Sequence, residues 1–267
     1  MHFSLAFSPC PNDTFLFGAI ALGLVQYPET DWKVHLLDIE TLNRSALDGS
    51  FDVTKLSVHA WMSARHQYTL LHIGGAFTDS EGPVVVANRP CTIQDLAGRR
   101  LVFPGRYTTA YLLYRMLVPG EGDHHFLPYD RIAPAIASGA FDAGVIIHET
   151  RFTFADHGLE HVLDLGRWWR QETGLPLPLG CCAIRSSLHA EWGHAVETLM
   201  KQSLSLARHG SSDLEDYMRR HACEMAPEVL DRHVRLFVNR YTEDFGDRGW
   251  MALCELESRA HRAGLLS

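Results

Sequence analysis

The feature that most limits the fold of this chain is an internal repeat. Residues 5–23, LAFSPCPNDTFLFGAIALG, resemble residues 101–117, LVFPGRYTTAYLLYRML: each begins as a short apolar strand and continues through a Pro-containing loop into a helical run. Residues 46–60 and 135–149 also resemble each other, since each ends a helix, turns on a glycine and enters a strand through Phe-Asp. Repeats of this kind indicate duplicated structural units, so we predict two similar α/β lobes.

Strands and helices alternate over about the first 165 residues, which is typical of α/β proteins with a mostly parallel sheet covered on both faces. We expect strands at 4–8, 33–38, 52–58, 70–74, 83–88, 100–103, 142–147 and 161–165, and helices at 13–25, 41–48, 108–118 and 130–138. From about residue 190 the pattern is helical, and these helices are expected to pack on the first lobe.

The predicted fold class is therefore α/β, with two lobes and a cleft between them. Lobe one would comprise residues 1–87 and 186–267, including the C-terminal helices, and lobe two would comprise residues 88–185. The chain would cross between the lobes twice, near 86–90 and near 180–186. Two short crossings form a hinge, and the cleft between hinged lobes is a common place for a ligand.

Composition narrows the classes of function. A net charge of -8 without a basic cluster argues against nucleic-acid binding. No apolar run is long enough to span a bilayer, and the N-terminus lacks the features of a signal peptide, so we expect a cytoplasmic protein that binds no membrane. The six cysteines show neither a CxxC pair nor zinc spacing, so we expect free thiols and no metal site, with Cys181 and Cys182 buried and inert.

Four polar segments follow predicted strands, at the sheet edge where open α/β sheets bind ligands. These segments are Ser8 to Asp13, Lys55 to Ser57, residues 105–110 and His148. The third, GRYTTA, leads directly into a helix, whose first N–H groups are unpaired and lie at the positive end of the helix dipole. We therefore expect an anion site there, with hydroxyl groups from Thr108 and Thr109, although Thr108 could serve only as the helix cap.

Two further side chains leave alternatives open. Lys55 could be an exposed side chain on an edge strand, or it could lie with Ser57 on the wall of a pocket for an acidic ligand. His148 ends the apolar run in GAFDAGVIIHET, where a side chain passes from the core to the cleft, although a single one of 16 histidines can also be structural. With a reference pKa of about 6.5, His148 suits a general base at neutral pH, and Glu149 or another carboxylate could orient its ring.

Seven motifs in chain order resemble those of the 1,4-dihydroxy-6-naphthoate synthases of the futalosine route to menaquinone. They are SPCPNDTF, DIETLN, TKLS, PGRYTTAY, YDRI, IIHETRFT and GLPLPLG. The resemblance runs from about residue 5 to residue 185 and continues more weakly through the helical C-terminus. The sequence contains no GxGxxG, Walker, GxSxG or HExxH motif, which argues against nucleotide-cofactor, P-loop, serine-hydrolase and zincin chemistry.

The resemblance implies a fold like that of the type II periplasmic binding proteins and a carbon–carbon lyase that needs no metal or other cofactor. Its substrate would be cyclic dehypoxanthine futalosine, a small acidic molecule, and its products would be 1,4-dihydroxy-6-naphthoate and a sugar-derived fragment. No obligate protein partner is implied. His148 would accept a proton. The substrate-binding residues would be Lys55, Leu56, Ser57, Thr108, Thr109 and Ala110, and further candidates for the cleft lining are Asn12, Asp13, Asn43 and Arg151.

Two alternative functions use the same fold. A cytosolic binding or sensor protein for a small organic acid would close on its ligand without forming a product. A chorismate-acting enzyme of the same pathway would share the fold and act on a different substrate. The TKLS, TTA and IIHE segments favour the synthase, and formation of the naphthoate from cyclic dehypoxanthine futalosine would separate the three.

Overall fold

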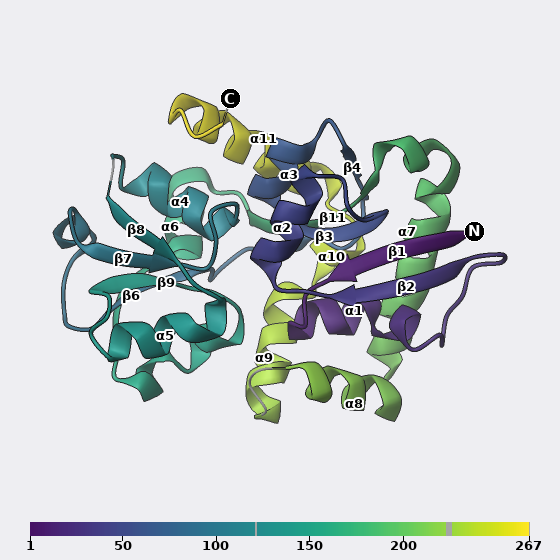
Figure 1. Ribbon diagram of the computed structural model, residues 1–267, viewed down its shortest axis with the longest axis horizontal. Coiled ribbons are helices and arrows are strands. Elements are labelled where there is room, and N and C mark those ends of the chain that lie inside the picture. The colour runs from purple at the N-terminus through teal and green to yellow at the C-terminus, as the bar shows by residue number, and fades with distance from the viewer. Residues whose placement is uncertain (121, 223–225, 267) are drawn as a thin grey trace.

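The structure is a computed structural model that describes residues 1–120, 122–222 and 226–266, so Cys223 lies outside the described residues. Two sheets lie side by side, each with helices packed against it (Figure 1). The first sheet has the order β2-β1-β3-β11-β4, with β5 paired to β11, and the second has the order β10-β6-β9-β7-β8. The two-lobe α/β fold expected from the sequence is confirmed.

The elements have the following bounds. The strands of the first sheet are β1 (His2–Phe7), β2 (Asp31–Leu36), β3 (Val53–Ser57), β4 (Tyr68–Leu70), β5 (Ala76–Thr78) and β11 (Leu177–Arg185). Those of the second are β6 (Val84–Ala87), β7 (Arg100–Phe103), β8 (Asp123–Phe126), β9 (Ala143–Ile146) and β10 (Glu160–Asp164). The α-helices are α1 (Pro11–Ala21), α2 (Ile39–Leu47), α3 (Val58–Ala64), α4 (Thr109–Leu117), α5 (Tyr129–Ala137), α6 (Leu165–Thr173), α7 (Ser186–His209), α8 (Ser212–His221), α9 (Pro227–Phe237), α10 (Arg240–Glu243) and α11 (Gly246–Arg262). Short 3₁₀ helices are η1 (Ile93–Leu96), η2 (His148–Phe152) and η3 (Phe154–His157).

The internal repeat is visible in the strand orders. β1 lies between β2 and β3 in the first sheet, β7 lies between β8 and β9 in the second, and all of these neighbours are parallel. β11 continues the first order beside β3, β6 continues the second beside β9, and both run antiparallel. The repeated sequence thus builds the same core topology twice. The expectation of mostly parallel sheets is wrong, because the strands that enter each lobe from the other lobe run against their neighbours.

The two crossings between the sheets lie earlier in the chain than expected. The chain leaves the first sheet after Thr78 and joins the second at Val84, and it leaves the second sheet after Asp164 and returns to the first at Leu177, with α6 in between. The expected division therefore placed two strands in the wrong lobe. β6 lies within residues 1–87, which were expected in lobe one, but it pairs in lobe two. β11 lies within residues 88–185, which were expected in lobe two, but it pairs in lobe one. Both strands are largely buried and apolar, so their composition does not indicate which sheet they join.

Local signals set the ends of the repeated helices. Asp38 and Thr108 cap α2 and α4, each accepting a hydrogen bond from N–H groups of the first helical turn. Gly49 and Gly139 follow α2 and α5 with φ of 64° and 78°, in the left-handed region where glycine has no Cβ penalty. These two glycines occupy equivalent places in the repeat, as the sequence indicates.

The C-terminal helices pack mainly on the first lobe, as expected. α7 contacts α1 and β11, α8 and α9 contact α1, and α11 contacts both β11 and α4. α9 also contacts η2 of the second lobe and stands between the two lobes in Figure 1. One helix from the end of the chain therefore reaches the seam where His148 lies.

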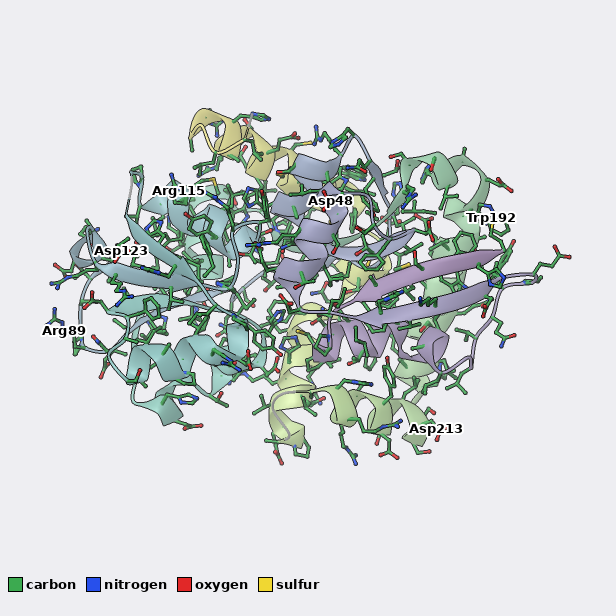
Figure 2. All side chains as sticks on the ribbon, in the orientation of Figure 1. Asp48, Arg89, Arg115, Asp123, Trp192 and Asp213 are labelled. Atoms are coloured by element: carbon green, nitrogen blue, oxygen red, sulfur yellow. The ribbon has the colours of Figure 1, made fainter. Side chains whose placement is uncertain are left out.

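The outer surface of both lobes is charged. Asp48, Arg89, Asp123 and Asp213, labelled in Figure 2, project outward from four different parts of the chain, so charges of both signs are spread over the surface. Across the described ranges, no helix is both long enough and apolar enough to cross a membrane.

Candidate active site

A pocket lies between the two lobes, and the interface between domains is a common place for a small-molecule site. Ten of the eleven predicted site residues line it: Asn12, Asp13, Lys55, Leu56, Ser57, Thr108, Thr109, Ala110, His148 and Arg151. The other lining residues are Ser8, Ile39, Ala76, Pro83, Ile147, Leu179, Gly180, His233 and Phe237. The eleventh predicted residue, Asn43, does not line the pocket.

Lys55 is buried in an interior strand of the first sheet, which excludes the exposed edge-strand alternative. Its Nζ lies 3.2 Å from Oδ1 of Asp13 and donates to the backbone carbonyl of Gly74 at 2.9 Å. Burial alone would lower the pKa of Lys55, but the negative charge of Asp13 outweighs it and the pKa is raised. Lys55 is therefore charged at neutral pH, and its charge is already matched within lobe one.

The adjacent cysteines Cys181 and Cys182 are buried in β11, as expected. Burial raises the pKa of both thiols, and that of Cys182 reaches about 12. Since the thiolate is the reactive form, both side chains are chemically inert at neutral pH.

Asn43 holds Ser57, which lines the pocket, in place. Its Nδ2 donates to Oγ of Ser57 at 3.0 Å, and its Oδ1 accepts from the backbone N–H of Ser57 at 2.9 Å. A hydroxyl that accepts in this way still has its own proton to donate. Asn43 therefore leaves the hydroxyl of Ser57 as a hydrogen-bond donor for a ligand.

Thr108 acts as the helix cap that the sequence analysis allowed. Its Oγ1 donates to the carbonyl of Gly105 at 2.8 Å and accepts from the N–H of Tyr111 at 3.2 Å. Its hydroxyl is thus used within the loop and helix, which leaves the backbone rather than this side chain as the source of donors at the start of α4.

Thr109 joins the two lobes. Its hydroxyl donates to the carbonyl of Leu179 at 2.8 Å and accepts from the N–H of His59 at 3.2 Å, and both of these residues belong to lobe one. The backbone N–H groups of Thr109 and Ala110 open α4 and have no acceptor within the helix. An anion in the pocket can be bound by these N–H groups.

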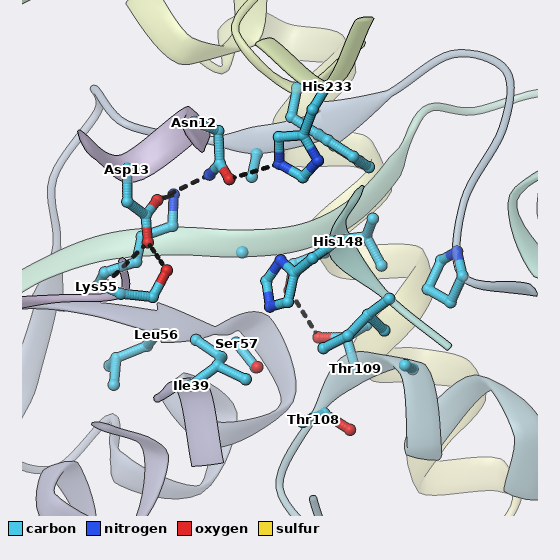
Figure 3. Close-up of a pocket in the computed structure, with 18 of the residues that line it drawn as sticks. Asn12, Asp13, Ile39, Lys55, Leu56, Ser57, Thr108, Thr109, His148 and His233 are labelled. Carbon is cyan, nitrogen blue, oxygen red and sulfur yellow. Dashed lines mark hydrogen bonds and ion pairs between the residues drawn. The ribbon is translucent and has the colours of Figure 1, made fainter. Parts of the chain in front are cut away.

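His148 lies two residues after the end of β9, at the start of η2, with φ of 56°. The centroid of its ring lies 4.7 Å from that of Tyr129 and 6.2 Å from that of His233. Figure 3 shows the rings of His148 and His233 together at the pocket. Within the described residues, its Nε2 is buried and has no hydrogen-bond partner. Burial lowers the pKa of His148 to about 4, while the negative charge of Asp13 acts in the opposite direction. The ring is therefore neutral at pH 7.

A chain of polar contacts links Lys55 to His233 (Figure 3). Asn12 donates its Nδ2 to Oδ1 of Asp13 at 2.7 Å, and its Oδ1 lies 2.9 Å from Nε2 of His233. Because an ionised carboxylate only accepts, Asn12 must turn its oxygen toward His233, so His233 has its proton on Nε2. Burial keeps the pKa of His233 well below its usual value, and so do the positive charge of Arg151 and the charge that His148 carries when it is protonated.

Arg151 lines the pocket, but its guanidinium mainly braces lobe two. Nε donates to the carbonyl of Gly82 at 2.8 Å, and the two terminal nitrogens contact Glu81 and Asp164, each at 2.9 Å. These partners lie beside the two crossings between the lobes. Arg151 therefore stabilises the hinge region next to the pocket.

One cluster in the described part of the chain has the donor types of a metal site. The ligand-type atoms of Cys10, His148 and Glu149 lie within 4.8 Å of one another. A sulfur, a nitrogen and an oxygen donor would suit a zinc-like ion. The spacing of the cysteines along the sequence predicts no metal site.

The chain matches the sequence model of a family described as menaquinone biosynthesis over residues 3–262. It is 44% identical to a 1,4-dihydroxy-6-naphthoate synthase of Thermus thermophilus, with 98% of this chain and 94% of the relative covered. It is 38% identical to the corresponding protein of Streptomyces coelicolor, with the same coverage. The chain belongs to the 1,4-dihydroxy-6-naphthoate synthase family. This confirms the resemblance seen in the seven sequence motifs.

Solved structures place this family among known folds. A crystal structure of a protein from Archaeoglobus fulgidus has a TM-score of 0.93 and 35% identity, covering 99% of this chain and 98% of the other. The alkanesulfonate-binding protein of Xanthomonas axonopodis has a TM-score of 0.74 at 15% identity, covering 100% and 94%. The second likeness concerns the fold alone, and it confirms the periplasmic-binding-protein-like architecture of the synthase family.

Sequence reasoning does not identify His233, which lines the pocket, or Glu40, which lies outside the lining and contacts the loop before α4. His233 lies in α9, where nothing distinguishes it from the other histidines, since its place beside Asn12 depends on how a distant helix packs. Glu40 lies in the DIETLN motif and accepts hydrogen bonds from the loop before α4. The motif could have indicated Glu40, because an acidic residue in the first turn of a helix is a candidate to contact a loop of the other lobe, here the predicted anion loop at residues 105–110.

Proposed function

We propose that this protein converts cyclic dehypoxanthine futalosine into 1,4-dihydroxy-6-naphthoate, and that it does so as a carbon–carbon lyase. The observation that most supports the proposal is the position of His148 in a pocket between the lobes, in a chain of the synthase family. Formation of the naphthalenediol makes the late steps favourable by aromatisation. The protein must then hold an acidic polycycle and remove a proton from carbon.

His148 is proposed as the proton acceptor. Its neutral ring at pH 7 has a free lone pair, and no described group occupies its Nε2. When the ring takes up a proton, the carboxylate of Asp13 in the same pocket favours the imidazolium electrostatically. A positioned base of this kind contributes about 100- to 10,000-fold to a rate.

The substrate carboxylate is proposed to bind at the start of α4. The N–H groups of Thr109 and Ala110 and the hydroxyl of Ser57 are donors in the lining of the same pocket. Donors fixed by a helix and a buried amide need no reorganisation when charge develops on the ligand. Lys55 contributes its positive charge as one member of its pair with Asp13.

The closed form of the pocket supports a reaction shielded from water. Thr109 bonds across the seam to β11 and to the N-terminus of α3, so substrate entry requires the lobes to separate. We further propose that the substrate is the only partner needed, that no cofactor takes part, and that the protein acts in the cytoplasm.

The test is incubation of the purified protein with cyclic dehypoxanthine futalosine, with the naphthoate detected by its absorbance and mass. We expect product from the wild type. No product, with ligand-induced closure, would favour an organic-acid sensor, and turnover of chorismate instead would favour the other enzyme of the pathway.

The first prediction concerns the base. His148→Asn should lower turnover about 100- to 10,000-fold while the protein still folds and binds substrate, because asparagine tolerates the left-handed backbone better than most residues. Steady-state kinetics and thermal unfolding would be measured together. Turnover close to that of the wild type would remove His148 from the mechanism.

A further inference from the structure

One carboxylate of lobe one holds the loop that precedes α4. Oε1 of Glu40 accepts from the N–H of Arg106 at 3.0 Å, and Oε2 accepts from the N–H of Tyr107 at 3.1 Å. Arg44, one turn further along α2, donates its Nε to Oε1 at 3.2 Å. Two successive backbone N–H groups that point at one anion form a nest of the kind that binds phosphate or carboxylate groups. In this protein the nest is occupied by the carboxylate of Glu40.

Gly105 makes room for this carboxylate. A Cβ at residue 105 would lie 2.2 Å from Oε2 of Glu40 and 2.5 Å from its Cδ, which is too close for atoms that are not bonded. Gly105 is not among the glycines with positive φ, so the glycine is needed here for space and not for its backbone conformation. Glu40 and Gly105 therefore fit each other across the boundary between the lobes.

The contact fixes the start of α4. Residues 105–107 are followed by Thr108, Thr109 and Ala110, which line the pocket, whereas Arg106 and Tyr107 do not. Because Glu40 fills the nest, a substrate carboxylate cannot use the two N–H groups of the loop. It is directed instead to those of the first turn of α4.

We propose that Glu40 and Gly105 are positioning residues for the substrate carboxylate, a role that rests on the proposed function. Glu40 docks the loop of lobe two onto lobe one, which holds the first turn of α4 over the pocket and closes the competing anion nest. Neither residue lines the pocket. Their effect should therefore appear in substrate binding more than in the chemical step.

A double-mutant cycle tests the pair: Glu40→Ala, Gly105→Ala and the double variant. Each single variant should raise KM for the substrate about tenfold or more with kcat changed less than about threefold, since only positioning is lost. Gly105→Ala should have a smaller effect in the Glu40→Ala background than in the wild type, because Oε2 and Cδ of Glu40 are then absent and only the Cβ of residue 40, at 2.7 Å, remains close. Additive effects would overturn the proposed fit, and a wild-type KM in Glu40→Ala would overturn the role.

A second measurement does not depend on turnover. Hydrogen exchange of the N–H groups of Arg106 and Tyr107 should be about tenfold or more faster in Glu40→Ala than in the wild type without any ligand. Glu191→Ala, which removes an exposed acidic side chain from α7, is the matched control and should change neither exchange nor KM. Unchanged exchange in Glu40→Ala would show that the carboxylate does not hold the loop. If the wild type forms no product, the proposed function fails, and the exchange result still decides the contact.

Discussion

His148 has a backbone conformation that residues other than glycine rarely adopt. Its φ is 56°, and the other described non-glycine residue with positive φ, Glu29, lies in an exposed turn. A conformation of this kind costs about 1–3 kcal/mol and persists where the surroundings enforce it, often at functional sites. Just beyond β9, His148 has its ring 4.7 Å from that of Tyr129 and 6.2 Å from that of His233, between centroids. The strain is therefore consistent with a ring placed for chemistry.

Buried neutral histidines make stability depend on pH. Burial lowers the pKa of His59 and of His148 to about 4, and that of His233 well below 6.5. In the unfolded chain these rings take up protons near pH 6.5, so between that pH and about 4 the unfolded state binds more protons. We predict that the free energy of unfolding is highest above pH 6.5 and falls by several kcal/mol toward pH 4, to which His148 contributes roughly 3 kcal/mol.

Urea unfolding between pH 4.5 and 7.5 measures this dependence. His148→Asn should show a shallower decline than the wild type, because one of the three rings no longer takes up a proton on unfolding. Equal slopes for the two proteins would contradict the assignment of His148 as a buried neutral ring.

At the residue scale, the sequence allowed correct placement of side chains that follow a strand or begin a helix. Lys55, Ser57, Thr109 and His148 were found because strand ends and helix starts meet at one sheet edge. His233 was not found, because its position depends on packing between segments more than 200 residues apart, as the separation of 221 from Asn12 shows. Local sequence does not contain that information.

At the scale of elements, a buried ion pair joins α1 to β3. Lys55 and Asp13 are both buried, and Nζ of Lys55 lies 3.2 Å from Oδ1 of Asp13. Removal of one partner leaves the other with a buried charge that is not compensated. Lys55→Met should therefore lower the free energy of unfolding by about 3–5 kcal/mol. The double variant Lys55→Met with Asp13→Asn should be more stable than Lys55→Met alone. Chemical denaturation of the set measures the coupling, and a double variant as unstable as the sum of the single variants would exclude it.

The elements themselves were predicted unevenly. The strands and helices with apolar periodicity were found close to their observed bounds, including β1, β3, β7 and α4. β8 was missed because its sequence, DHHF, lacks an apolar run, although it is the counterpart of β2 in the repeat. The direction of β6 and β11 could not be predicted, since antiparallel pairing here follows from the crossing between lobes and not from the composition of either strand.

At the scale of the whole molecule, two glycines meet where the chain crosses between the lobes. A Cβ on Gly166 would lie 2.4 Å from the backbone nitrogen of Gly82, and a Cβ on Gly82 would lie 2.8 Å from that of Gly166. Asp164 caps α6 and accepts from the N–H of Gly82 at 2.9 Å, so both crossings are bonded to each other. The hinge is therefore a packed backbone contact and not two independent linkers.

Gly166→Ala should disrupt this contact. The obstructing atoms belong to the backbone, which cannot move aside without shifting the crossing, so we predict a loss of about 1–3 kcal/mol in the free energy of unfolding. Differential scanning calorimetry would measure it against Gln171→Ala, an exposed change on the same helix that should have little effect. A melting temperature equal to that of the wild type would show that this contact does not contribute to stability.

The shared strand order has a consequence for how the molecule is made. The second sheet is built from one uninterrupted stretch of chain, β6 to β10, whereas the first needs β11 inserted between β3 and β4. During synthesis, the N-terminal strands must wait for residues 177–185 to leave the ribosome before their sheet is complete. Lobe two can thus fold first. Lobe one, which depends on long-range strand pairing, folds later and limits the rate of folding of the whole chain.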